Sequence, residues 1–347
     1  MNFFMPLLFS FIATILGFFP TVWLAKKFKL LDNPRLRPHP AHTQKRTVPR
    51  AGGLAVFLGI IIAITIFIPF EKTTVGILIG LLILLLIGLL DDKYPDFSPY
   101  LRLLGQFIAA GFVVFSGIGI NFVTNPLGGI VNFSPFLSYI LALVWIVWVM
   151  NMINWSKGVD GQMPGITTVA SLILGLLSLK LTLSGDPTQA KVAILAFITT
   201  GASLGLLLFN WHPARIFPGF SGSTILGFMI AVLAILSGAK LATAGLVLLI
   251  PATDFAYTFL RRILSGKSPV WGDRGHLHHK LLESGLTHQQ IALFYILGSV
   301  ILGAVALNLS SNGKVFAAIL VALGLLGGIL WLNFFGDFLK HRAPNNG

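Results

Sequence analysis

The chain has 347 residues, of which 55% are apolar and only 10% carry charge. Soluble globular proteins are nearer a quarter charged and disordered chains have few apolar residues, so both classes are excluded. The formal net charge of +13 on so apolar a chain predicts contact with an anionic membrane surface and no nucleic-acid partner. Cysteine is absent, which excludes disulfides and thiolate metal sites.

Apolar segments long enough to cross a bilayer follow one another along the chain. We expect one all-α, polytopic integral membrane domain over residues 1–347, with about 10–11 transmembrane helices, some of them short. The expected spans are Phe3–Leu24, Ala51–Phe70, Thr74–Leu90, Leu103–Ile120, Phe136–Met150, Ile166–Leu183, Val192–Phe209, Thr224–Ser237, Leu241–Phe259, Ile291–Leu309 and Val315–Phe335.

The distribution of basic residues predicts the orientation of this array. If the N-terminus lies outside, most of the 24 Lys and Arg residues and all 8 His residues fall in the inner connections. The outer connections, such as Ser310–Lys314, are short and carry little charge. We therefore expect a multi-pass protein of the inner (plasma) membrane whose functional loops are cytoplasmic.

The first inner connection is basic and rich in proline. Arg46 and Arg50 stand just before Gly52-Gly53, a flexible pair that opens the second span, and they are candidates for binding phosphate. The alternative is a topology signal that also contacts lipid headgroups.

The second inner connection begins with Asp91-Asp92, at the end of the third span. Adjacent carboxylates at a membrane border are costly unless they are paired, hydrated or bound to metal. Mutual repulsion raises the pKa of one of them, which favours a proton acceptor or a cation site. The alternative is a solvated helix cap.

The third inner connection combines amides, a lysine and a carboxylate around two glycines. Asn151 and Asn154 are three residues apart and share a helix face, and Lys157 and Asp160 follow them. Such a turn suits a polar phosphorylated ligand, because glycine allows the backbone to approach it closely. A plain turn is the alternative.

The last two inner connections carry further anion-binding patterns. The segment 219–223 is a Gly–Ser turn that enters a helix, a usual seat for an anion; the alternative is that Ser223 is only an N-cap. The fifth connection contains Arg274, His276, His278 and His279. These could bind metal or a diphosphate. No HExxH pattern is present, which disfavours a zinc protease, and we expect phosphate or nucleotide binding rather than metal.

Taken together, the inner connections resemble the polyprenyl-phosphate N-acetylhexosamine-1-phosphate transferases, membrane enzymes that begin the synthesis of cell-envelope polysaccharides such as peptidoglycan, teichoic acid and O-antigen. The resemblance runs from Asp32 to about Gly285. The matching segments are VPRAGG (48–53), GLLDDKY (88–94), NMIN (151–154), GVDG (158–161), FNWHPARIF (209–217), GFSGS (219–223) and GKSPVWGDRGHLHHKLL (266–282). The His-x-His-His pattern looks more like the branch that uses UDP-GlcNAc than the branch that uses the muramyl pentapeptide.

The resemblance implies phosphoryl transfer, in which a polyprenyl (undecaprenyl) phosphate attacks the β-phosphorus of a UDP-sugar and UMP leaves. It makes Asp91, Asp92 and Asp160 catalytic: the first two would orient or deprotonate the lipid phosphate, and Asp160 would lie by the nucleotide. Asn154 would lie by Mg²⁺ or Mn²⁺. Substrate binding would fall to Arg46, Arg50, Asn151, Lys157, Arg274, His276, His278 and His279. Whether the chain forms a homodimer is left open.

The chain departs from the family pattern at two positions. Lys157 and Phe220 stand where the family usually has Asp, and the second of these Asp residues is a metal ligand. Three hypotheses follow: an active enzyme with a rearranged metal site that uses Asn154 with Asp91 or Asp160, an enzyme in which Lys157 supplies the charge of the metal, or a non-catalytic relative that binds lipid phosphate or regulates a partner. A transporter is disfavoured, because its ionisable residues would lie at mid-bilayer.

Overall fold

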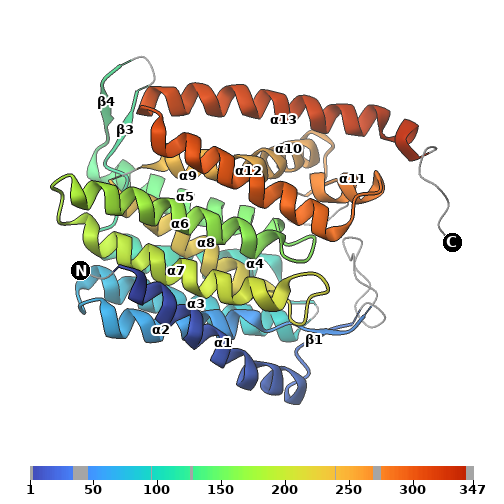
Figure 1. The fold of residues 1–347 in the computed structure, drawn as a ribbon, viewed down its shortest axis with the longest axis horizontal. Coiled ribbons are helices and arrows are strands. Elements are labelled where there is room, and N and C mark those ends of the chain that lie inside the picture. Colours follow the sequence, from blue (N-terminus) through green and yellow to red (C-terminus); the bar gives the residue numbers. More distant parts are fainter. Residues whose placement is uncertain are drawn as a thin grey trace.

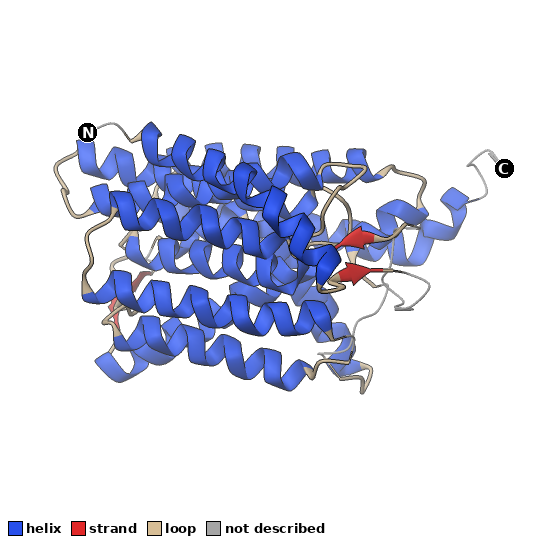
Figure 2. Cartoon of the chain, turned by 90° about the horizontal axis from the view of Figure 1, so that it is seen from below, coloured by secondary structure: helices blue, strands red, loops and turns tan. Residues whose placement is uncertain are grey.

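The computed structural model describes residues 3–33, 46–94, 96–125, 128–238, 240–268 and 275–340. In these residues the chain is mostly helical, and long helices lie side by side in one array (Figures 1 and 2). The longer helices are α1 (Phe4–Lys27), α2 (Gly52–Phe67), α3 (Lys72–Lys93), α4 (Pro99–Phe115), α5 (Pro135–Trp155), α6 (Gln162–Leu183), α7 (Gln189–Asn210), α8 (Gly219–Leu236), α10 (Leu249–Leu264), α12 (His288–Asn308) and α13 (Ser311–Lys340). The shorter elements are α9 (Leu241–Val247), α11 (Leu277–Glu283), β1 (Leu31–Asp32), β2 (Val48–Pro49), β3 (Phe122–Thr124) and β4 (Ile130–Asn132).

The helices account in order for the expected membrane spans. Eight of the described helices are long and apolar enough to cross a bilayer, and α2 and α4 are shorter apolar helices. The two shortest predicted spans correspond to α5 and α8, which are 21 and 18 residues long. The prediction of an all-α polytopic membrane protein is therefore confirmed.

The expected span Leu241–Phe259 is wrong as a single helix. It consists of α9 and α10, whose axes differ in direction by 83°. Pro251 explains the break, because it has no N–H to donate to the carbonyl of Val247, as residue 251 of a continuous helix would. The segment is therefore a broken span or a re-entrant loop. Helix α11 was not predicted from the sequence.

Helix α8 lies at the centre of the array and α13 at its edge (Figure 1). Of the most apolar 18 residues of each helix, 94% are buried within the protein in α8 and 6% in α13. A helix that is apolar on all sides is covered either by protein or by lipid. The first turn of α8 therefore brings backbone and side-chain polar groups into a protein-lined environment where each of them needs a partner.

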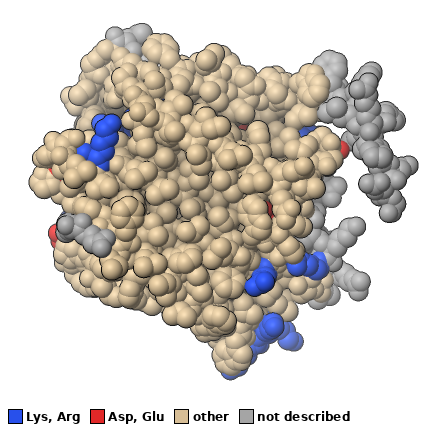
Figure 3. All heavy atoms as spheres, in the orientation of Figure 1, with Lys and Arg blue, Asp and Glu red and all other residues tan. Residues whose placement is uncertain are grey.

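Two small hairpins mark the two ends of the array. Strand β1 pairs antiparallel with β2, with Leu31 opposite Pro49, and β3 pairs with β4. In Figure 1 the label of β1 lies at the same end as α11, which we call the polar end, and β3 and β4 lie at the opposite end. On the face drawn in Figure 3, Lys and Arg lie mostly towards the two ends, and the middle is almost uncharged. This distribution fits an array that spans a membrane along its helices.

Candidate active site

The aspartate pair at the end of α3 is held by Arg50, which follows β2. The Arg50 guanidinium donates from Nε to Asp92 Oδ1 (3.0 Å) and from Nη2 to Asp91 Oδ2 (3.2 Å). Asp91 is 5% exposed and Asp92 is fully buried. Burial by itself lowers the pKa of Arg50, but the charges of Asp92 and Asp91 outweigh burial and raise it. The pair is therefore neither a plain helix cap nor free.

Close packing of α3 on α8 places Asp92 beside the Gly–Ser turn. Gly88, one turn before the pair, lies directly against Ser221, and a Cβ at Gly88 would clash with the backbone of Ser221. Asp92 Oδ1 accepts a hydrogen bond from the Phe220 N–H (2.8 Å), and Asp92 Oδ2 accepts one from Ser221 Oγ (2.9 Å). The anion bound at the N-terminus of α8 is therefore the Asp92 carboxylate of the protein itself.

Backbone hydrogen bonds fix the start of α2 against the start of α8. The Phe217 N–H donates to Pro49 O (2.8 Å), and the Gly52 N–H donates to Phe217 O (3.0 Å). As expected, Gly52-Gly53 opens the second helix, and both glycines are buried. The same contacts hold Arg50, between Pro49 and Gly52, in a fixed position.

Arg102, in the first turns of α4, is a site residue that the sequence reasoning missed. Its Nε lies 3.2 Å from Asp91 Oδ1, and its Nη2 donates to Phe97 O (3.2 Å). It is the single charged residue of Pro99–Phe115, and a charge in an apolar helix at a membrane border usually has a specific partner. That signal could have identified it.

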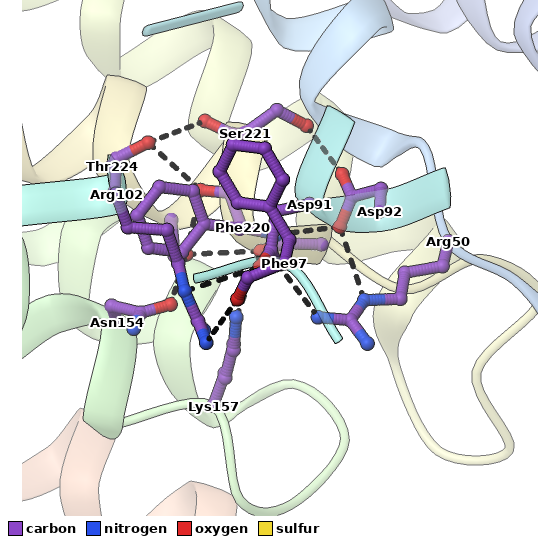
Figure 4. A network of polar contacts seen from close by, with 12 residues as sticks. Arg50, Asp91, Asp92, Phe97, Arg102, Asn154, Lys157, Phe220, Ser221 and Thr224 are labelled. Atoms are coloured by element: carbon purple, nitrogen blue, oxygen red, sulfur yellow. Dashed lines mark hydrogen bonds and ion pairs between the residues drawn. The ribbon is translucent and has the colours of Figure 1, made fainter. Parts of the chain in front are cut away.

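Lys157, from the connection after α5, reaches the same centre. Its Nζ donates to Gly219 O (3.1 Å) and lies 5.9 Å from the centroid of the Phe220 ring. Burial and the charge of Arg50 lower the pKa of Lys157 to about 7, although Asp92 and Asp91 oppose the shift. Figure 4 shows the head groups of Lys157, Arg50 and Arg102 around the two carboxylates.

The two asparagines of the third inner connection have different surroundings. Asn154 Oδ1 accepts a hydrogen bond from Ser223 Oγ (2.8 Å), which ties the end of α5 to the first turn of α8. Asn151 Nδ2 donates to Gln106 Oε1 of α4 (2.7 Å) and to Val147 O (2.8 Å). Asn154 therefore borders the aspartate centre, whereas the described contacts of Asn151 join α5 to α4.

Asp160 lies in a neighbouring cluster with two histidines. Asp160 Oδ2 lies 2.8 Å from His212 Nδ1 and accepts a hydrogen bond from the Ala214 N–H (3.0 Å). The ring of His288 stacks on that of His212, with 4.8 Å between centroids. In the part of the chain that the structure describes, these three residues form the one group whose ligand atoms, all within 4.8 Å of one another, are spaced to hold a metal ion.

The histidine-rich segment covers the third inner connection. A Cβ at Gly158 would collide with the His278 imidazole, so His278 lies directly over that turn. Burial, and then the neighbouring His279 and His276, lower the pKa of His278. His278 is therefore neutral near pH 7, and its buried Nδ1 has no hydrogen-bond partner among the described residues.

The other predicted phosphate-binding residues are partly engaged elsewhere. His276 Nδ1 lies 3.3 Å from Asp254 Oδ2, and Arg262 Nη2 lies 3.4 Å from His276 Nε2. Arg46 Nη2 donates to Ala214 O (2.6 Å), beside the Asp160 cluster. Arg274 lies outside the described residues.

The residues around the aspartate pair do not fit a divalent cation. Mg²⁺ requires several oxygen ligands in near-octahedral geometry, and the guanidinium of Arg50 bridges the two carboxylates where such an ion would bind. Phe220 has no side-chain atom that could bind a metal ion. The neighbouring carbonyl, Gly219 O, already accepts a hydrogen bond from the Lys157 ammonium. The charges of Arg50, Arg102 and Lys157 are instead suited to a negatively charged ligand.

The chain is also similar in sequence to a family model and to several known proteins. The chain matches glycosyl transferase family 4 over residues 74–238. It is 30% identical over 286 residues to the probable undecaprenyl-phosphate N-acetylglucosaminyl 1-phosphate transferase of Bacillus subtilis, covering 80% of this chain and 76% of that protein. It is 30% identical to the decaprenyl-phosphate N-acetylglucosaminephosphotransferase of Mycobacterium tuberculosis (92% and 86% covered). It is 28% identical to the undecaprenyl-phosphate alpha-N-acetylglucosaminyl 1-phosphate transferase of Escherichia coli K12 (92% and 88% covered).

Proposed function

Because the chain belongs to glycosyl transferase family 4, among the polyprenyl-phosphate N-acetylhexosamine-1-phosphate transferases, we propose that it transfers GlcNAc-1-phosphate from UDP-GlcNAc to polyprenyl phosphate and releases UMP. The names of the relatives support the sugar phosphate and the lipid acceptor. The UDP donor and the release of UMP rest on the motif resemblance and on the chemistry of the centre.

The observation that carries the proposal is the convergence of separate connections on one polar centre. Five segments contribute to this centre and are joined by hydrogen bonds and ion pairs (Figure 4). They supply Arg50, Asp91 with Asp92, Arg102, Lys157 and the start of α8. His278 lies directly over the adjacent turn. Such a centre suits two phosphorylated substrates that must be held together.

In the proposed reaction, an oxygen of the lipid phosphate attacks the β-phosphorus of the UDP-sugar. A new P–O bond forms, and the bond from the β-phosphorus to the oxygen that bridges the two phosphates breaks. The electron pair and that oxygen leave with UMP. Catalysis of this kind depends mainly on positioning and on stabilising charge on the phosphates.

The contacts favour an orienting role for the aspartates over proton removal. Asp92 is fully buried and holds Arg50, the Phe220 N–H and Ser221. Asp91 holds Arg50 and Arg102. Each carboxylate therefore positions cations that can bind the phosphates of lipid and nucleotide.

We further infer that the polar end faces the cytoplasm across the inner membrane, with the N-terminus outside. The excess of Lys and Arg in the connections of the polar end supports this orientation. A sugar nucleotide made in the cytoplasm would then reach the centre directly.

The test uses the full chain, purified in lipid nanodiscs, with UDP-GlcNAc labelled in the sugar and undecaprenyl phosphate. We expect UMP and a labelled lipid to form in equal amounts, and labelled UDP-GalNAc shows whether the sugar is selected. Reactions without undecaprenyl phosphate are the control for hydrolysis. Failure of every UDP-N-acetylhexosamine to give UMP and labelled lipid would contradict the proposal, and retained binding of undecaprenyl phosphate would then favour a non-catalytic relative.

A further inference from the structure

We propose that the aspartate centre works without a divalent cation, and that Arg50, Arg102 and Lys157 supply the positive charge that binds the phosphates. The inference rests on the proposed function for its catalytic part, and on the described contacts for its binding part.

The first argument is that each carboxylate oxygen already has a partner from the protein. Asp91 Oδ1 pairs with Arg102 and Asp91 Oδ2 with Arg50. Asp92 Oδ1 accepts from Arg50 and from the Phe220 N–H, and Asp92 Oδ2 accepts from Ser221 Oγ. A metal could bind here only after several charge-assisted hydrogen bonds were broken.

The second argument is that Phe220 and Lys157 fit one another. The guanidinium carbon of Arg102 lies 5.7 Å from the centroid of the Phe220 ring, and the ammonium nitrogen of Lys157 lies 5.9 Å from it. An aromatic face attracts cations electrostatically. The two departures from the family pattern therefore act together: the ring that cannot ligate a metal instead holds two side chains that carry positive charge.

The third argument is the charge balance of the centre. Three cationic side chains face Asp91 and Asp92, and the charge of Asp32 also acts on Arg50, so the protein's own cations already balance these carboxylates when Lys157 is charged. A divalent cation brought into this centre would be repelled by all three, because charges interact strongly where water is scarce. A phosphate or diphosphate would be attracted.

A second candidate, the Asp160–His212–His288 cluster, provides the competing explanation. It is spaced for a metal ion, and a metal there would make activity sensitive to chelators while leaving the aspartate centre unchanged. The experiment must therefore separate an ion at this cluster from no ion at all.

The first arm compares the rate of UMP release in Mg²⁺ and in excess EDTA, for wild type and for the matched control Lys93→Ala at the same end of α3. We expect both rates to change by less than about threefold between the two conditions. A larger loss in EDTA that Mg²⁺ or Zn²⁺ restores would overturn the proposal if His288→Ala still shows the same metal effect. Loss of the metal effect in His288→Ala would instead assign the ion to the Asp160 cluster and leave the aspartate centre without one.

The second arm restores the usual acids with the double variant Lys157→Asp, Phe220→Asp. If the cationic side chains replace a metal, the double variant loses turnover in EDTA, and Mg²⁺ raises its turnover by at least about tenfold. A folded double variant, by size exclusion and circular dichroism, that is unaffected by Mg²⁺ counts against the exchange. If the variant does not fold, the wild-type comparison decides.

The third arm separates this inference from the proposed function. If no condition gives UMP, the proposed function fails, and binding of inorganic pyrophosphate is measured by calorimetry in EDTA. The cation centre is supported if Mg²⁺ does not improve the affinity for pyrophosphate and if Lys157→Ala weakens it by about tenfold. Binding that requires Mg²⁺, or that Lys157→Ala and Lys93→Ala weaken equally, overturns it.

Discussion

At the scale of single residues, the key interaction is the Arg50 guanidinium that bridges Asp91 and Asp92. A planar guanidinium can bond two carboxylates at once, which a lysine ammonium does less well. Asp92 in turn fixes the start of α8 through Phe220 and Ser221. One buried carboxylate thus positions both a cation and a turn.

We therefore predict that Asp92→Asn lowers turnover by at least about a hundredfold, because an amide cannot accept from all three donors as a carboxylate does. UMP release measures the effect. The control is Glu71→Gln, at the other end of the same helix, where the side chain is 57% exposed. Rates within a few fold of wild type for both variants would contradict the assignment.

The lowered pKa of Lys157, about 7, predicts a pH dependence for anion binding. The ammonium form predominates below that pH. Burial, and then the charges of Arg50, Asp92, Asp91 and Arg102, set this pKa. Affinity for pyrophosphate in EDTA should therefore fall as the pH rises from about 6 to about 8. Lys157→Arg stays charged throughout, so its affinity should change only as pyrophosphate itself titrates. Identical pH profiles for both proteins would contradict the prediction.

Residue identities were partly predictable and residue partners were not. The sequence placed Asp91, Asp92, Asn154 and Lys157 in candidate loops, and the structure brings these four to one centre. It could not assign Asn151 to Gln106, because that contact depends on how two helices pack. Such pairings are set by tertiary geometry, which one sequence does not display.

At the scale of secondary-structure elements, hydropathy predicted the helices and missed the features that shape the site. Continuous apolar runs identify spans because backbone groups in lipid must bond within a helix. The break before α10 could have been read from Pro251. Strands β1 and β2 are two residues long and have no periodicity to detect, yet β2 positions Arg50.

The approach of α3 to α8 at Gly88 gives a prediction at this scale. Gly88→Leu would push the helices apart at Ser221, so we expect a lower melting temperature and loss of UMP release. The matched control is Gly324→Leu on α13, because a Cβ at Gly324 would have no atom of a neighbouring element within 4 Å among the described residues. A melting temperature and activity for Gly88→Leu equal to those of Gly324→Leu would show that this contact is not required.

At the scale of the whole molecule, the polar centre lies at one end of a helical array whose middle is almost uncharged on the face of Figure 3. The two ends carry different chemistry, with the candidate site at one and the β3–β4 hairpin at the other (Figure 1). This asymmetry is what a transferase needs if its nucleotide is found on one side of the membrane and its lipid acceptor within it.

Orientation can be tested cleanly because the chain has no cysteine. Single cysteines at Ser310 and Lys267, both exposed at opposite ends of spans, are treated with a membrane-impermeant maleimide in intact cells. We predict that Ser310→Cys is labelled and that Lys267→Cys is labelled only after lysis. The reverse pattern would place the centre outside.

The most direct measurement is a structure of the full chain in nanodiscs with UDP-GlcNAc, prepared in EDTA. We predict that the diphosphate lies within hydrogen-bond distance, about 3 Å, of Lys157 and Arg102 and beside His278. A nucleotide bound away from Asp91 and Asp92, or a metal ion that displaces Arg50 from them when Mg²⁺ is supplied, would contradict the account.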